Sequence, residues 1–419
     1  MPLKTALALF LFLPVAGWCS DWPQFLGPTR NAVYSAADLA DSWPKDGPPI
    51  LWDRKVGQGF SGPAVASGKL ILFHRLENKE IIECLAAETG KELWKSDYPT
   101  AYRDDFGFDE GPRATPAIAD GRVYTYGAEG ALQCTDLATG KSVWVINTRK
   151  EFQAAKGFFG IACSPLIEGP AVMLSVGGRD KAGIAAFDRT NGRVLWKASD
   201  DEGSYSSPVA ATVAGHRYCF FLTRGNLIGA EPVNGKIFFQ FPFRPPMRNS
   251  VTAATPVIVD DFVFLSASYG TGAVLLKLSE NVPQKVWESE DALSSHYATS
   301  VYHDGFLFGI HGRTDPGFEP PASLRCIEFK TGKLKWEQAA FGAATLILAG
   351  DQLLILTERG ELIRAPASPA GFKPNARAQI LPTQVRAHPA LADGLFYARS
   401  KDKLACISLK RTGSSKEKQ

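Results

Sequence analysis

The sequence lacks the features that mark several large protein classes. Lysine and arginine form no cluster, and a formal net charge of +3 over 419 residues is too small to indicate nucleic-acid binding. After the N-terminal region, no apolar stretch approaches the length of a membrane-spanning helix. We therefore expect no nucleic-acid partner and no transmembrane segment.

Motifs for catalysis and metal binding are also missing. No C-x-x-C spacing occurs, which excludes zinc clips and haem attachment of that type, and no loop has the spacing of an EF-hand. A Ser-His-Asp signature, a P-loop and a dinucleotide fingerprint are absent as well. The sequence therefore predicts no metal site and gives no direct sign of an enzyme.

The first 20 residues have the pattern of an export signal. Lys4 is their only early charge, and the apolar stretch 5–15 is too short to span a bilayer. This pattern predicts a signal peptide over residues 1–20 and a periplasmic or secreted protein, with a buried first strand as the alternative. The context of Cys19 approaches the lipobox of bacterial lipoproteins, but Trp18 directly before it fits poorly. A lipid anchor at Cys19 is therefore the less favoured alternative.

A repeated segment dominates the rest of the chain. The run 84–94, Cys-Leu-Ala-Ala-Glu-Thr-Gly-Lys-Glu-Leu-Trp, returns at 134–144 and, more loosely, at 187–196, 234–239 and 331–336. A degenerate copy lies between Leu276 and Trp287. Self-similarity with a period of about 40–50 residues is the signature of repeat architectures such as propellers.

A second marker precedes each copy. Two apolar segments are joined by a turn that contains Gly or Asp, as at 115–124 and 255–264, and eight such starts occur along the chain. Asp-Gly, Asn-Gly and Thr-Gly turns favour hairpins, so each unit holds four short antiparallel strands. The sequence therefore predicts an all-β, eight-bladed β-propeller.

The last unit ends without a Trp-bearing strand, because the chain runs into a polar tail after Leu409. The unclaimed segment 50–54, Ile-Leu-Trp-Asp-Arg, is similar to the last strand of the first unit. We expect this N-terminal strand to complete the last blade and close the ring, which removes exposed sheet edges. We therefore expect a single propeller over residues 21–410 and a disordered tail over residues 411–419.

The Thr-Gly-Lys-x-x-Trp pattern resembles the tryptophan-docking repeat of quinoprotein dehydrogenases and of the outer-membrane assembly lipoprotein BamB. The stretches 21–24, 111–116, 205–208 and 296–300 also look like bacterial proteins called pyrroloquinoline-quinone-binding-like β-propeller repeat proteins. The resemblance covers about residues 21–409, and its name describes the repeat rather than a bound cofactor. It implies that tryptophans pack between blades, here Trp52, Trp94, Trp144, Trp196, Trp287 and Trp336.

Four cysteines share one position in the repeat, on the third strand of their blades: Cys84, Cys134, Cys326 and Cys406. Equivalent side chains on different blades point into separate layers, so we expect buried hydrophobic thiols rather than disulfides. A bridge between Cys163 and Cys219 is the alternative.

Strand direction predicts where a site would lie. Loops between blades and loops between second and third strands share one face, and seven arginines lie in them. Because arginine suits carboxylates and phosphates, these residues could form a positive funnel around the axis for an anionic ligand. The candidates are Arg113, Tyr205, Arg224, Arg248, His296, His311, Arg313, Arg359 and Arg386. Alternatively the arginines pair with acids, such as Asp104, Asp105, Asp109, Glu110 or Asp180. His296 and His311 are also the best candidates for proton or metal chemistry.

Two functions from different classes remain. The bare ring favours a non-catalytic binding or assembly scaffold of the bacterial cell envelope, similar to BamB, monomeric and with envelope proteins or an anionic small molecule as partners. The other is a quinoprotein dehydrogenase that oxidises an alcohol or sugar with pyrroloquinoline quinone and calcium. Large quinoprotein alcohol dehydrogenases carry a disulfide of adjacent cysteines at the cofactor, and this sequence has no Cys-Cys pair, so we expect no resident cofactor. Hydrolase or lyase action on a polysaccharide has only loop acids to support it.

Overall fold

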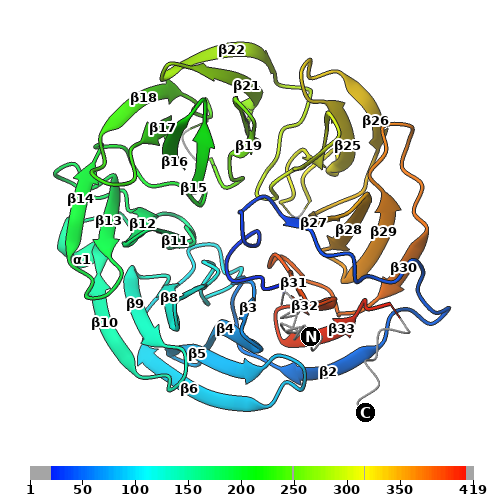
Figure 1. Ribbon diagram of the computed structural model, residues 1–419, viewed down its shortest axis with the longest axis horizontal. Coiled ribbons are helices and arrows are strands. Elements are labelled where there is room, and N and C mark those ends of the chain that lie inside the picture. The colour runs from blue at the N-terminus through cyan, green and yellow to red at the C-terminus, as the bar shows by residue number, and fades with distance from the viewer. Residues whose placement is uncertain (1–19, 248–249, 316, 412–419) are drawn as a thin grey trace, which may run out of the picture.

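The computed structural model describes residues 20–247, 250–315 and 317–411. Within these ranges, eight sheets are arranged radially around a central axis, as Figure 1 shows. The sheets follow one another around the ring in chain order. The eight-bladed, all-β propeller that the repeats predict is confirmed.

The first four blades each contain four antiparallel strands. Blade one contains β3 (Ala64–Ala66), β4 (Lys69–Leu76), β5 (Lys79–Ala86) and β6 (Glu92–Pro99). Blade two contains β7 (Ala117–Ala119), β8 (Arg122–Tyr126), β9 (Ala131–Asp136) and β10 (Ser142–Asn147), followed by the short helix α1 (Thr148–Phe152). Blade three contains β11 (Leu166–Glu168), β12 (Ala171–Ser175), β13 (Ile184–Asp188) and β14 (Val194–Ala198). Blade four contains β15 (Val209–Val213), β16 (His216–Leu222), β17 (Asn226–Ala230) and β18 (Ile237–Pro242).

The second half of the ring repeats this plan, with one addition in blade seven. Blade five contains β19 (Val257–Val259), β20 (Phe262–Ala267), β21 (Gly272–Ser279) and β22 (Val282–Ser289). Blade six contains β23 (Val301–His303), β24 (Phe306–His311), β25 (Ser323–Glu328) and β26 (Leu334–Gln338). Blade seven contains β27 (Ala344–Ala349), β28 (Gln352–Thr357), β29 (Glu361–Pro366), β30 (Ala376–Gln379) and, parallel to β27, the added strand β1 (Val33–Tyr34). Blade eight contains β31 (Ala390–Ala392), β32 (Leu395–Arg399), β33 (Lys403–Ser408) and β2 (Ile50–Lys55).

The place of a strand within its blade determines its sequence pattern. In blade one the innermost strand β3 is wholly buried, and β5 is buried at six consecutive positions. Strands covered on both faces are continuously apolar for this reason. The outermost strand β6 instead alternates exposed and half-buried side chains, because one of its faces meets water.

The predicted tryptophans join neighbouring blades at six of the eight interfaces. Trp94 donates its Nε1–H to the carbonyl of Leu137 at 2.9 Å, and a Cβ on Gly140 of that turn would come within 2.7 Å of the indole. The glycine therefore gives the ring room to approach the backbone. Equivalent hydrogen bonds of 2.8–3.1 Å join Trp52, Trp144, Trp196, Trp287 and Trp336 to the following blade.

The N-terminal strand closes the ring as predicted. β2 pairs antiparallel with β33, and Trp52 lies opposite Cys406 in that pairing. Trp52 then docks on blade one through the carbonyl of Ala87, at 3.0 Å. Strands from the two ends of the described chain thus share one sheet, which leaves no unpaired edge inside the ring.

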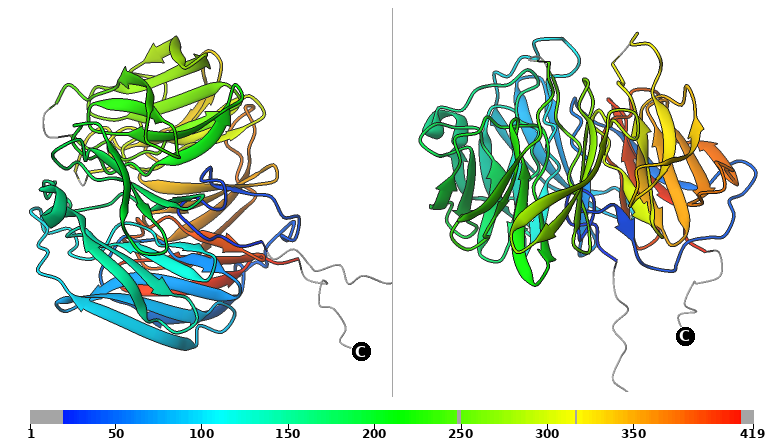
Figure 2. Two further views of the ribbon diagram at one scale, coloured as in Figure 1. Left: turned by 60° about the vertical axis from the view of Figure 1, so that its left-hand side comes forward. Right: turned by 90° about the horizontal axis from the view of Figure 1, so that it is seen from above.

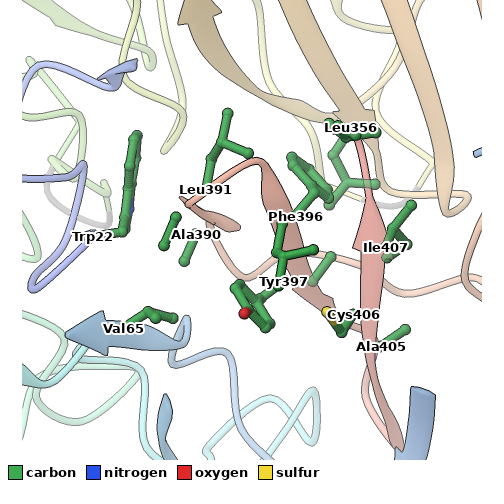
Figure 3. Close-up of a cluster of buried hydrophobic side chains, with 14 of the residues drawn as sticks. Trp22, Val65, Leu356, Ala390, Leu391, Phe396, Tyr397, Ala405, Cys406 and Ile407 are labelled. Carbon is green, nitrogen blue, oxygen red and sulfur yellow. The ribbon is translucent and has the colours of Figure 1, made fainter. Parts of the chain in front are cut away.

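The segment 20–34, which precedes β2, was not expected to fill the axis, yet it does. Residues 20–34 enter the channel, turn and return to join blade seven as β1. Trp22 exchanges two backbone hydrogen bonds of 2.8 Å with Val65, and its 1% exposed indole lies beside the innermost strand β31, as Figure 3 shows. We call residues 20–34 the axial plug. Figure 2 shows the described chain beginning and ending on one face of the disc, while the long loops rise from the other.

Arg30 anchors the plug without an acidic partner. Its guanidinium is 3% exposed and donates to backbone carbonyls of Pro208, at 2.8 Å, Ser164, at 3.3 Å, and Pro165. Gln24 accepts from its Nε–H at 2.9 Å. Burial lowers the pKa of Arg30 to about 10, which still leaves the side chain charged at neutral pH. A buried cation is thus held by carbonyl dipoles of two adjacent blades.

Two of the eight blade interfaces lack a docking tryptophan. Between blades four and five, Tyr218 donates to the side chain of Asn281, where the turn of the repeat is degenerate. Between blades seven and eight, the stretch 35–49 covers the gap: Trp43 and Leu39 pack against the core there, and Ala40 N–H donates to the Leu409 carbonyl at 2.8 Å. The chain's own N-terminal segment therefore replaces the missing tryptophan.

The six described cysteines are buried and unpaired, as the repeat position of four of them predicts. Cys163 and Cys219 form no bridge; the Cys219 sulfur lies 3.2 Å from that of Met173. Two ranges lie outside the described residues: 1–19, which includes Cys19, and 412–419. Ser20 and Arg411 are ordered parts of the fold, bonded to Asp393 and Asp38. No helix within the described ranges could cross a membrane.

Candidate axial binding site

A cavity of about 180 Å³ lies where the inter-blade loops meet around the axis. Every blade contributes to its wall, seven through the residues before the innermost strand and blade seven through Thr345 in β27, and Phe25 of the axial plug also lines it. The channel therefore ends at this cavity instead of running through the disc. Loops of different blades converge here because each blade's entry point faces the axis.

Hydroxyl groups in these loops tie neighbouring blades together. Thr115 Oγ1 accepts the backbone N–H of Gly62 at 3.2 Å, Ser164 Oγ accepts that of Thr115 at 2.9 Å, and Ser207 Oγ accepts that of Ser164 at 2.9 Å. This arrangement explains the Thr-Pro and Ser-Pro pairs that open the repeats. Because each hydroxyl accepts from the backbone, its own proton remains available to an acceptor in the cavity.

Aromatic rings form much of the wall. Phe108 and Phe159 lie 6.1 Å apart between ring centroids, and Phe159 lies 5.8 Å from Tyr205. The Tyr205 hydroxyl accepts the backbone N–H groups of Phe158, at 2.8 Å, and Phe159, at 3.2 Å, which fixes this loop against blade four. Phe60 completes the group on the side of blade one. None of these phenylalanines was predicted as a site residue, although paired Phe residues in two inter-blade loops were a signal in the sequence.

Arg113 lines the cavity but is already bound to an acid. Its Nη2 lies 2.8 Å from Asp104 Oδ2, and the Asp104 side chain is fully buried. The guanidinium also lies 5.6 Å from the ring centre of Phe60 and 5.7 Å from that of Phe159. Arg113 therefore serves to hold the loop and its aromatic rings, one of the pairings that the sequence left open.

Arg386 is held differently. Its Nε donates to Glu358 Oε1 at 2.6 Å, while its two terminal nitrogens have no hydrogen-bond acceptor among the described residues. The guanidinium lies 5.8 Å from the centre of the Phe60 ring and 5.7 Å from that of Phe108. A guanidinium oriented at Nε and free at its terminal nitrogens can still donate to a ligand.

His296 lines the cavity as a neutral ring. The backbone N–H of Thr314 donates to its Nδ1 at 3.2 Å, so the ring proton lies on Nε2, which faces the Tyr269 hydroxyl at 3.0 Å. Burial lowers the pKa of His296 to about 4. His311 lies in a separate hollow, where its Nδ1 accepts the Ser294 N–H at 3.0 Å and burial likewise lowers its pKa to about 4. The predicted histidine pair does not converge on one point.

The structure thus brings Arg113, Tyr205, His296 and Arg386 together and places the other candidates apart. Arg313 pairs with Asp315 at 2.6 Å and lies in hollows farther out; Arg224 pairs with Glu202 at 3.2 Å; Arg359 is exposed in one of the outer hollows. Arg248 lies outside the described residues. The sequence predicted one mouth formed by all nine residues. The structure instead brings four of them to the axial cavity and places the other described candidates elsewhere.

Charges at the cavity balance one another. Arg113 faces Asp104, Arg386 faces Glu358, and Asp315, a carboxylate in the wall, is held by Arg313. Three cations stand against three carboxylates, so these pairs give no net positive charge. No group of three or more His, Cys, Asp or Glu side chains in the described ranges is arranged to hold a metal ion.

The fold is a repeat propeller with a cavity on its axis, at the centre of one face. Residues 78–338 match the family described as outer membrane protein assembly factor BamB, and the chain belongs to this family. The structure of BamB from Moraxella catarrhalis is similar in fold, with a TM-score of 0.61 and 15% identity over 86% of this chain and 97% of that one. Quinohemoprotein alcohol dehydrogenase from Comamonas testosteroni gives a TM-score of 0.64 at 14% identity, covering 94% and 81%.

Curated relatives match over shorter stretches. Outer membrane protein assembly factor BamB of Xanthomonas campestris is 36% identical over 90 residues, which is 21% of this chain and 21% of the relative. The Comamonas testosteroni dehydrogenase is 27% identical over 195 residues, or 45% of this chain and 27% of the relative. The chain thus spans about a quarter or less of the length of these relatives, and they divide between an assembly factor and an enzyme.

Proposed function

We propose that the chain is a non-catalytic binding and assembly scaffold of the bacterial cell envelope, exported to the periplasm or secreted, and acting as a monomer. The observation that carries this proposal is the pairing at the axial cavity, where each cation in the wall already has an acid. Membership of the family described as outer membrane protein assembly factor BamB supports the same function.

The titratable groups of the cavity suit binding better than proton transfer. A general base needs a free lone pair and a pKa near the working pH. The Nδ1 lone pair of His296 is occupied by Thr314, and its pKa of about 4 is far below neutrality. His388, at the floor, has both ring nitrogens next to carbonyl oxygens, of Pro389 at 2.9 Å and Leu346 at 3.2 Å. These contacts orient the imidazole rings of His296 and His388 and leave neither ring suited to act as a general base.

A partly exposed aromatic cluster beside the cavity, in which Phe106 is exposed and the other rings are half-buried, offers a surface for a partner protein. Phe106 is 57% exposed and lies within 6.3 Å, between ring centroids, of Phe108, Phe158 and Phe159. We call these four residues the mouth cluster. Apolar groups exposed together and bordered by charges are typical of protein interaction sites.

Co-purification tests the scaffold. Envelope proteins captured from membranes of cells that export the protein should be lost with Phe106→Asp, because a charge in the mouth cluster opposes apolar docking. Val145→Asp is the matched control: Val145 is 61% exposed but lies on the outer strand β10. Failure to capture any envelope protein, or equal capture by both variants, would contradict docking at this face.

The alternative is a dehydrogenase that uses pyrroloquinoline quinone and calcium, which the dehydrogenase relatives favour. The cavity residues do not fit that group. Calcium takes about six to eight oxygen ligands, whereas the wall offers one carboxylate, Asp315, already bound by Arg313. A quinone with three carboxylates would also meet a cavity with no net positive charge. Dye-linked alcohol oxidation after adding the quinone and Ca²⁺ would establish the enzyme and overturn the scaffold.

A further inference from the structure

We propose that the axial cavity binds a single aromatic ring bearing one carboxylate, and that Arg386 binds the carboxylate. The inference rests on the proposed binding function and names the ligand of that site. The ligand is either a free small aromatic acid or the C-terminal aromatic residue of a polypeptide, since both present the same chemistry.

The volume of the cavity suits a ligand with one aromatic ring. A closed apolar cavity of about 150 Å³ is large enough to hold one benzene ring. The axial cavity measures about 180 Å³, so it has room for one ring and a small substituent.

The walls favour an aromatic occupant. Phe25, Phe60, Phe108, Phe159 and Tyr205 all line the cavity. Aromatic rings prefer offset or edge-to-face contacts with one another, worth about 0.5–1.5 kcal/mol beyond the area they bury. A planar ring lying in the cavity against these side chains would meet such contacts on more than one side.

The wall also holds donors that lack an acceptor. Arg386 is fixed at Nε by Glu358 and stacked on Phe60 and Phe108, which leaves its terminal nitrogens for a ligand. An oriented guanidinium whose terminal N–H groups lack an acceptor is the donor that a ligand carboxylate would meet in this cavity.

The charges limit the ligand to one carboxylate. Arg113 is held by Asp104 and Asp315 by Arg313, whereas the terminal nitrogens of Arg386 have no acceptor among the described residues and remain for a ligand. Its partner Glu358 cancels its charge overall, so a ligand with several carboxylates would be repelled by Glu358 and Asp315. One carboxylate can bind the guanidinium through directional hydrogen bonds.

Calorimetric titration with defined probes tests the inference. Phenylacetate should bind about 10–100 times more tightly than phenylacetamide, because a hydrogen bond to a charged group is worth about that factor. Cyclohexylacetate should bind more weakly than phenylacetate. The tetrapeptide Gly-Gly-Gly-Phe, with a free carboxylate and as its amide, separates the two sources: tighter binding of the peptide acid assigns a chain terminus, and its rejection assigns a free acid.

Substitutions then assign the carboxylate. Arg386→Gln should remove the preference for phenylacetate over phenylacetamide, so that this variant binds the two probes alike. Arg179→Gln removes an exposed arginine of a loop in blade three and is the matched control. Because Arg386→Gln leaves Glu358 unpaired, the double variant Glu358→Gln with Arg386→Gln and a thermal melt of each protein verify folding.

The inference is overturned if the folded protein binds neither acid, if acid and amide bind equally, or if Arg386→Gln and Arg179→Gln behave alike. Its failure is distinguishable from failure of the scaffold. The titrations use the purified chain without partners, whereas the scaffold is judged by envelope proteins captured through Phe106.

Discussion

The rim and the axis of this propeller are held together by different means. At the rim, six interfaces use the same contact, an indole N–H donated to a carbonyl of the next blade. At the axis, a single non-repeated segment carries Trp22 and Arg30 into the channel and fills it. The rim contact can be lost at one interface and kept at the others, whereas the plug contacts several blades at once.

This difference shows how a ring of similar blades acquires a unique site. Repeated contacts make every interface alike and give no blade a special role. The plug breaks that symmetry: Phe25 lines one side of the axial cavity, and Trp22 stacks on His388 at 6.4 Å between ring centres. The axis, and not the rim, therefore determines where a ligand can bind.

The largest expected effect is at the plug. Trp22→Ala should lower the free energy of unfolding by about 3–5 kcal/mol, because a fully buried indole leaves a cavity. Trp94→Ala, at a half-buried rim position, should cost less, about 2 kcal/mol, since part of that indole already meets water. Urea unfolding of both variants measures the difference. A larger loss at Trp94 would show that the rim, rather than the axis, dominates stability.

The next effect distinguishes a buried histidine at the axis from an exposed one through the pH dependence of the free energy of unfolding. Burial lowers the pKa of His388 to about 4, although the two carbonyls at its ring nitrogens act in the opposite direction. In the unfolded chain a histidine titrates at about 6.5, so the unfolded state takes up the proton first. Stability should therefore fall as the pH drops from about 6.5 to about 4, by at most about 3 kcal/mol for this residue.

Unfolding measured across that pH range, for His388→Gln and the wild type, checks this expectation. The variant should show a flatter decline, while His216→Gln, an exposed position on β16, should follow the wild type. His296 and His311 also have pKa values of about 4 and will keep part of the slope. Identical slopes for His388→Gln and the wild type would contradict the assignment.

The smallest effect tests the repeated rim contact with two glycines of one blade. Gly140 and Gly121 have φ values of +73° and +72°, but only a Cβ on Gly140 would approach the Trp94 indole, at 2.7 Å. Gly121→Ala should cost about 1 kcal/mol from backbone strain alone. Gly140→Ala should cost about 1–2 kcal/mol more, because the ring must move. Equal losses in thermal or urea unfolding would mean that the indole does not need this space.

Much of the rim could be predicted from sequence because its information is local and repeated. A Thr-Gly turn followed by a Trp identifies a hairpin and its outer strand wherever it occurs, and Trp52 before the first unit revealed the closing strand. The axial cavity could be predicted only in part: of the residues that strand direction assigned to one face, Arg113, Tyr205, His296 and Arg386 line this cavity. It could not show that Asp104 and Glu358 pair with two of those arginines, since pairing depends on how loops fold back.

By itself, the sequence determined the number of blades, their strand order and the docking tryptophans, because short-range turn chemistry and periodic burial act within each unit. Only the tertiary structure decided that residues 20–34 fill the channel, that the arginine charges are balanced, and that Phe60, Phe108 and Phe159 surround the ligand space. The plug and the aromatic wall arise where segments far apart in the chain meet at one axis, and the ion pairs depend on how single loops fold, so no repeated pattern encodes either.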